Sequence, residues 1–308
     1  MTTSPPPHTR AAPVSGNEAA VPRRRGSAPS PAWAALAPLA VLIALFFAVP
    51  VIGMTTTSLL VPADEPGTRT LGLGNFAALG SGSRLLALEN SLFLSFVAAT
   101  VAALLGGICS WAISALRSKA VDSLTAVVSS VLANDGGVPL AFSFIVSVGN
   151  TGYFIALVTA VDPTFTLYST KGLILMYQYF LIPTMILLTL PSFVALRRQW
   201  REANTSLGGT SLTFWRRVGL PIITPALIGA WILMFGAAFG THASAAVLIG
   251  SGALPLIPLE IAGQLAGSAA TGGEGVAMAL GVTTGVIAVV VLIGFNALTR
   301  RTARWLDA

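Results

Sequence analysis

Long stretches without any charged residue constrain this chain more than any other feature of its sequence. Residues 26–63, 90–116 and 218–259 contain no Asp, Glu, Lys or Arg. Only 9% of the 308 residues are charged and 54% are hydrophobic, whereas about a quarter of an ordinary soluble domain is charged. A surface exposed to water needs more charged residues than this chain has. We therefore expect an integral membrane protein.

The apolar segments predict how often the chain crosses the bilayer. A crossing helix needs about 20 mostly apolar residues. Six segments meet this requirement and predict an all-α fold with transmembrane helices near residues 33–55, 90–115, 123–147, 172–195, 222–242 and 277–298. Segment 153–161 is apolar but too short to span as a helix. The link 243–276 is apolar but broken by prolines, which predicts an interfacial or re-entrant piece rather than a seventh span.

The distribution of basic residues predicts the orientation. Connections on one side of the membrane carry 14 of the 17 Lys and Arg residues, and those on the other side carry 3. Cytoplasmic connections are the ones enriched in Lys and Arg. We therefore expect both termini and the link 196–221 to be cytoplasmic. The net charge of +6 then reflects topology and not nucleic-acid binding.

The first 31 residues differ in composition from the rest. They contain seven prolines among Ser, Thr, Ala and Arg, which predicts a disordered cytoplasmic tail before a transmembrane domain over 32–306. A signal peptide is the alternative, because Arg23–Arg25 precede an apolar run. That run exceeds the usual apolar core of about 7–15 residues and lacks a convincing small-x-small cleavage site, so we favour an uncleaved anchor.

Motifs for enzymatic chemistry are missing from the sequence. It has no G-x-x-x-x-G-K-[ST] phosphate loop, no H-E-x-x-H motif and a single cysteine, Cys109. His242 and Ser244 are two positions apart, so they would not face each other on a helix. We expect no catalytic residue, no metal site and no cofactor, and a membrane-embedded hydrolase is disfavoured.

The link between the fourth and fifth predicted helices is the most informative segment. Leu207 ends a first short helix, Gly208–Gly209 supply a left-handed turn, and Thr210 or Ser211 caps a second helix. Pro221 then opens the fifth span, where its missing N–H matters little. A loop that only fixes topology needs no such structure. The pattern favours an exposed docking element for a cytoplasmic partner.

This link resembles the EAA loop of binding-protein-dependent ABC importer permeases. The resemblance lies in a Glu-Ala pair, a glycine six residues after the glutamate, an aromatic position and a Leu-Pro ending. The matching residues are Glu202, Ala203, Gly208, Trp215, Leu220 and Pro221. The sequence departs from the family at Asn204, where a second Ala is usual, and at Gly209, where Ala is common.

The resemblance extends over about residues 86–299. Asn90-Ser91-Leu92 is similar to the family's usual Asn-Thr/Ser-Leu opening of a helix. Within the family, the sequence most resembles the polyamine, ferric-iron, phosphonate and thiamine permeases.

The resemblance implies a permease subunit in a bacterial cytoplasmic membrane. Its partners would be a second permease, identical or sister, a cytoplasmic dimer of ABC ATPases, and an external solute-binding protein. ATP hydrolysis would take place on the partner chain, and closure of the ATPase dimer would switch the bundle from inward-open to outward-open. The solute would be a polyamine, ferric ion, phosphonate or similar small polar or charged molecule. An ATPase-independent secondary transporter or channel is the alternative.

Few polar residues within the predicted spans are candidates for a solute pathway. Asp135 is the only acid well inside a span, and an intramembrane charge marks a functional site by default. The alternative is an Asp satisfied by nearby backbone where Gly136–Gly137 loosen the helix. Asn134, Tyr177 and Gln178 are further candidates, although buried Tyr and Gln also hydrogen-bond helices together. Gly236 and Gly240, like Gly281 and Gly285, form small-xxx-small pairs that favour close helix packing.

Overall fold

The computed structural model describes residues 32–62, 68–116, 118–250, 254–271 and 273–303. The chain divides into two units, residues 1–50 and 51–308. In the first unit, α1 (Ala32–Ile43) continues into a π-helical turn, η1 (Ala44–Ala48), and α2 (Val49–Leu59) begins at its end. The tail predicted over residues 1–31 lies outside the described residues.

The described residues contain five helices long and apolar enough to cross a membrane, or six if one bent pair counts as a single span. The five are Leu36–Leu59, Gly82–Leu116, Thr170–Val194, Ser211–Gly240 and Glu274–Gly294. These positions confirm the all-α, multi-span fold. The side of the membrane that the termini face stays a prediction.

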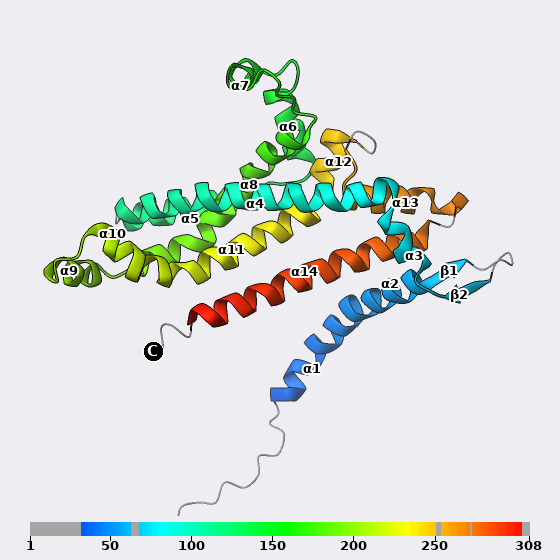
Figure 1. The fold of residues 1–308 in the computed structure, drawn as a ribbon, viewed down its shortest axis with the longest axis horizontal. Helices are drawn as coiled ribbons and strands as arrows, with labels where there is room; N and C mark the ends of the chain where they lie inside the picture. Colours follow the sequence, from blue (N-terminus) through cyan, green and yellow to red (C-terminus); the bar gives the residue numbers. More distant parts are fainter. Residues whose placement is uncertain (1–31, 63–67, 117, 251–253, 272, 304–308) are drawn as a thin grey trace, which may run out of the picture. The chain divides into compact units, whose positions relative to one another are not determined.

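In the second unit, α4 (Gly82–Leu116) packs along both α8 (Thr170–Val194) and α11 (Leu220–Gly240). Two further helices complete the bundle, since α5 (Lys119–Asn134) packs on α8 and α14 (Glu274–Ala303) packs on α11 (Figure 1). Helices that are distant in the sequence are thus neighbours in the bundle.

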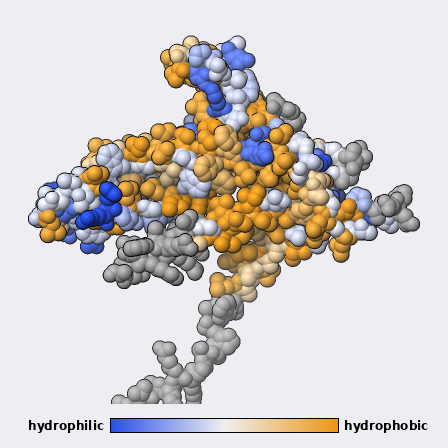
Figure 2. All heavy atoms as spheres, in the orientation of Figure 1, coloured by the Kyte–Doolittle hydropathy of each residue, from blue (hydrophilic) through white to orange (hydrophobic). Residues whose placement is uncertain are grey.

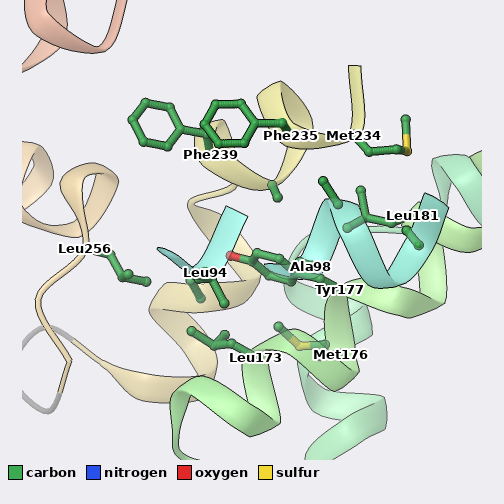
Figure 3. Close-up of a cluster of buried hydrophobic side chains, with 14 of the residues drawn as sticks. Leu94, Ala98, Leu173, Met176, Tyr177, Leu181, Met234, Phe235, Phe239 and Leu256 are labelled. Atoms are coloured by element: carbon green, nitrogen blue, oxygen red, sulfur yellow. The ribbon is translucent and has the colours of Figure 1, made fainter. Parts of the chain in front are cut away.

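A buried apolar core joins α4, α8 and α11 (Figure 3). Its members include Leu94, Ala98, Leu173, Met176, Tyr177, Leu181, Met234, Phe235 and Phe239. Close approach of α4 to α8 depends on Gly106, because a Cβ there would lie 2.7 Å from Met185 Cβ and 3.2 Å from the Ile182 carbonyl oxygen. Nearby, the Ser110 and Thr189 hydroxyls hydrogen-bond each other at 2.8 Å.

The single helix predicted over 123–147 is wrong. The structure has two helices there, α5 and α6 (Val138–Val148), bent by 98°. Gly137 has a φ of 81°, which breaks the helix, and Pro139 lies in the first turn of α6, where its missing N–H is tolerated. Asp135 therefore lies at a break between two helices and not within a continuous helix.

Helix α4 starts at Gly82 and not at residue 90 as predicted, because the charges of Arg84 and Glu89 do not end a helix. The Asn90-Ser91 pair consequently lies within α4, where it holds the later segment 255–257. Asn90 Nδ2 donates to the Pro255 carbonyl oxygen at 3.1 Å, and the Ile257 amide donates to Ser91 Oγ at 2.9 Å.

The link 243–276 contains two short helices, α12 (Ala243–Ile249) and α13 (Ile257–Thr271), neither of which qualifies as a span. Helix α12 packs on α6, and α13 packs on α14 and α4. The absence of a seventh span among the described residues of this link agrees with the prediction. Whether these helices enter the membrane stays a prediction.

The link 56–89 holds a small element that the sequence did not suggest. Strands β1 (Leu60–Pro62) and β2 (Arg69–Leu71) pair antiparallel. They are followed by α3 (Gly74–Ala77) and a 3-10 turn, η2 (Ala78–Gly80). Asn75 Nδ2 donates to the Ser58 and Leu60 carbonyl oxygens at 2.9 and 3.0 Å, which fastens α3 to the first strand.

The apolar segment near residue 155 forms α7 (Ile155–Val161), which is too short to span, as predicted. An exposed ion pair follows it, with Lys171 Nζ 2.5 Å from Asp162 Oδ2. Hydrogen bonds from Lys171 and Thr164 lower the pKa of Asp162 to about 2, so this carboxylate is charged at neutral pH.

Candidate functional site

The link between α8 and α11 folds as a helix–turn–helix, as predicted. Helix α9 (Arg198–Ser206) is followed by the turn 207–210 and by α10 (Ser211–Phe214), and a π-helical turn, η3 (Trp215–Gly219), leads into α11. Gly208 has a φ of +74°, and Thr210 Oγ1 caps α10 by accepting the Thr213 amide at 3.3 Å. Hydrophilic side chains gather over the end of the unit formed by α9 and α10 (Figure 2).

The two departures from the EAA pattern fit each other in space. Asn204 Nδ2 donates to the Thr210 carbonyl oxygen at 3.1 Å, which bridges the turn. A Cβ on residue 209 would lie 2.3 Å from Asn204 Oδ1, so Gly209 leaves the room that the Asn204 side chain occupies. The Gly209 amide also donates to the Asn204 carbonyl oxygen at 2.8 Å. The turn is therefore braced by a side-chain bridge that an Ala at residue 204 could not form.

We expect Gly209→Ala and Asn204→Ala to have strongly non-additive effects on this turn. Either change alone removes the bridge, which is worth about 1 kcal/mol, and should speed amide exchange at Gly209 or its substitute about fivefold. The double variant should exchange no faster than Asn204→Ala, because the Asn204 side chain that a Cβ at residue 209 would clash with is absent. Hydrogen exchange of the full chain, read on a digestion peptide that covers residues 203–214, measures this. Additive effects of the two substitutions would contradict the contact between Asn204 and Gly209.

Aromatic packing holds the link to the bundle. Phe214 is buried and lies edge-on to Trp215, with ring centroids 5.8 Å apart. The Arg201 guanidinium carbon lies 5.4 Å from the Phe214 ring centroid, a cation–π contact between α9 and α10. Trp215 covers Gly219, where a Cβ would come within 2.5 Å of the indole ring. These contacts order the link as far as Gly219, after which α11 begins.

The structure distributes the signature residues over two faces of the link. Ala203, Gly208 and Gly209 line a hollow of about 730 Å³ between α9 and the start of α11. Glu202 lies outside this hollow, is exposed, and pairs with Arg198 one helical turn earlier. Leu220 and Pro221 are exposed at the start of α11. This arrangement offers a partner an exposed acid and an adjoining hollow.

At the break between α5 and α6, Asp135 is exposed and its Oδ2 accepts a hydrogen bond from Tyr179 Oη at 2.9 Å. Sequence reasoning missed Tyr179, because the bend that brings α5 to this part of α8 is not visible in an apolar pattern. Asn134 Nδ2 donates to the Ser130 carbonyl oxygen of its own helix at 2.8 Å. The hydrogen bond between Tyr179 and Asp135 thus joins the break between α5 and α6 to α8.

Tyr177 and Gln178 lie elsewhere, in the contact between α8 and α4. The Tyr177 side chain is fully buried, and its hydroxyl has no hydrogen-bond partner among the described residues. Gln178 Nε2 donates to the Ala98 carbonyl oxygen at 3.2 Å, which ties α8 to α4. No group of three or more His, Cys, Asp or Glu side chains within the described part of the chain could hold a metal ion.

No protein-family model matches the chain, and no curated protein matches it significantly. Solved structures do. A chain of a bacterial ABC transporter involved in the import of the acidic polysaccharide alginate matches with a TM-score of 0.66 and 17% identity, over 88% of this chain and 95% of that chain. A bacterial alginate ABC transporter in complex with an alginate pentasaccharide-bound periplasmic protein matches with a TM-score of 0.65 and 16% identity, over 88% and 94%. The chain has the fold of a membrane chain of a bacterial ABC transporter.

Proposed function

We propose that this chain is the transmembrane permease subunit of an ATP-driven importer in a bacterial cytoplasmic membrane. The observation that carries the proposal is the helix–turn–helix link, which is exposed, braced by Asn204 and tied to α11 by Trp215. A secondary transporter has no need of such a link. The fold, shared over most of both chains with a bacterial ABC transporter, supports the same reading.

The proposed partners follow from this role. A dimer of cytoplasmic ATPases would dock on α9 and α10, and a second permease, identical or sister, would complete the pathway. An external solute-binding protein would deliver the solute, as the periplasmic protein in the matched complex suggests. ATP binding moves the bundle only if the docked link differs in energy between its two states. A rigid turn serves this purpose, because a yielding one would absorb the displacement.

We further propose that the solute is a small polar or charged molecule such as a polyamine, ferric ion or phosphonate. The matched transporter imports an acidic polysaccharide, which is a different class. The exposed carboxylate of Asp135, at a break between two helices, supports a cationic solute, such as a polyamine or ferric ion, near that point. Tyr179 would hold the carboxylate in place.

We expect Asp135→Asn to change solute uptake more than expression. The substitution removes the charge but keeps an oxygen that can accept from Tyr179 Oη. Uptake or its selectivity should change about tenfold or more, since a carboxylate's contact with a charged solute is stronger than a neutral one. Tyr179→Phe is the matched control, because it removes the hydrogen bond and keeps the charge. Equal losses of uptake and expression in Asp135→Asn would favour a structural role.

The energy source tests the proposal against a secondary transporter. Right-side-out vesicles of the native membrane would be loaded with ATP and mixed with the external solute-binding protein, and uptake of labelled putrescine, ferric ion and methylphosphonate would be measured one at a time. We expect uptake of one probe to require ATP and to persist when an uncoupler collapses the proton gradient. Uptake that needs the gradient and not ATP would overturn the ATPase coupling. If none of the three probes enters, the proposed solute class is wrong.

A further inference from the structure

A cationic cavity lies where α4, α5, α8 and α9 meet. It has a volume of about 490 Å³ and is lined by four basic side chains, Lys119, Arg197, Arg198 and Arg201, and one acidic side chain, Asp122. These charged residues come from the starts of α5 and α9, and uncharged residues at the ends of α4 and α8 complete the walls, at the side of the bundle predicted to be cytoplasmic. Two candidate spans, Gly82–Leu116 and Thr170–Val194, end there, and lipid headgroups lie at the ends of spans.

The charges of this cavity are only partly compensated. Arg198 pairs with Glu202, and Arg201 lies over the Phe214 ring. Lys119 and Arg197 form no ion pair among the described residues. Asp122 Oδ1 is buried and has no hydrogen-bond partner within the described part of the chain. The cavity therefore presents two cations without an ion-pair partner to an anion.

An apolar groove continues from the cavity along the bundle. It has a volume of about 380 Å³ and shares Trp111, Phe193 and Trp215 with the cavity. Beyond these residues its walls include Gly107 and Ile108 of α4 and Leu227 of α11. A ligand that fills both features has an anionic head and an apolar chain. A soluble anion has no apolar chain to fill the groove, and a neutral lipid has no net charge to pair with the basic side chains.

We propose that the cavity and groove together bind one phospholipid of the phosphatidylglycerol class. Lys119 and Arg197 hold the phosphate, as basic pockets between helices hold anionic headgroups. Asp122 adds a carboxylate to the cavity wall, which can accept a hydrogen bond from a glycerol hydroxyl. One acyl chain lies in the groove between α4 and α11. The site goes beyond the proposed function, since it requires a bilayer but no ATPase.

Native mass spectrometry of the full chain, released from nanodiscs of equal parts phosphatidylglycerol and phosphatidylcholine, tests this site. We expect wild type to retain phosphatidylglycerol selectively. A Lys119→Gln, Arg197→Gln double variant should retain it roughly thirtyfold less tightly, the factor expected when two basic side chains leave an anionic headgroup. The matched control is Arg216→Gln, Arg217→Gln, which removes two charges from the same link but not from this cavity.

Gly107→Leu tests the groove. A Cβ on Gly107 meets only Leu227 Cδ2, at 3.6 Å, so the backbone tolerates a side chain there that then fills the groove. We expect this variant to lose the retained phosphatidylglycerol. Equal retention in the cavity variant and its control would overturn the proposal. So would displacement of the lipid by free glycerol 1-phosphate, which would indicate a soluble anion, or by the ATPase partner, which would indicate that protein covers the cavity.

Discussion

Glu202→Lys is expected to abolish ATP-driven uptake while leaving folding and membrane insertion intact. The side chain of Glu202 is exposed, and its ion-pair partner among the described residues is Arg198 on the same helix. Such exposed pairs contribute only about 0.3–0.5 kcal/mol to stability, so the fold should tolerate the change. Like charges placed against a docked partner cost several kcal/mol, which predicts a loss of uptake of about a hundredfold or more.

A charge swap distinguishes a contact with the partner from the local ion pair. In the variant Arg198→Glu, Glu202→Arg, the pair within α9 and the net charge are both kept. We expect this variant to be as inactive as Glu202→Lys, because the ATPase would still meet a cation at residue 202. Uptake and the amount of chain in the membrane fraction measure the two effects separately. Full activity of the swapped variant would mean that Glu202 acts only within its own helix.

Gly106→Ala is expected to destabilise the bundle, whereas Gly107→Ala next to it should not. The methyl group at residue 106 would lie 2.7 Å from Met185 Cβ, and 2.8 Å from its Cγ, so α4 and α8 must move apart. Overpacking of this kind costs about 1–3 kcal/mol. At residue 107 the nearest atom of another helix is Leu227 Cδ2, 3.6 Å away, and replacing a helical glycine by alanine gains up to about 1 kcal/mol.

Thermal unfolding of the two variants in mild detergent measures this difference. We expect the midpoint of Gly106→Ala to fall below that of wild type and the midpoint of Gly107→Ala to match or exceed it. Because both variants add one methyl group to the same helix, helix propensity is matched between them. Identical midpoints would contradict the close packing of α4 on α8.

The sequence predicted the spans well because a charge-free apolar run has few other folds available in a membrane protein. It predicted the turn of the link for a local reason, since Gly208 and the capping Thr210 act on neighbouring residues. Two glycines and a nearby proline also indicate the break at residues 135–137, but counting apolar residues does not detect it. The predicted start of α4 is wrong because a charged residue marks the limit of an apolar run, and a helix can continue beyond that limit.

Contacts between distant residues could not be predicted from pattern alone. Gly106 permits the close approach of α4 to α8, yet it belongs to no small-xxx-small pair singled out in the sequence. Gly236 and Gly240 form such a pair, and no described residue of another helix lies within 4 Å of an ideal Cβ on either one. The bridge from Asn204 to Thr210 and the contact of Tyr179 with Asp135 likewise depend on where the chain folds back.

Mass spectrometry of the proteins that co-purify with the tagged chain in mild detergent tests the central claim most directly. The account predicts a stoichiometric P-loop ATPase in the wild-type preparation, and its loss from the Glu202→Lys preparation. The same measurement reveals whether the second permease is identical or a sister chain. A chain that purifies alone and still transports in liposomes without ATP would contradict the account and establish the secondary transporter.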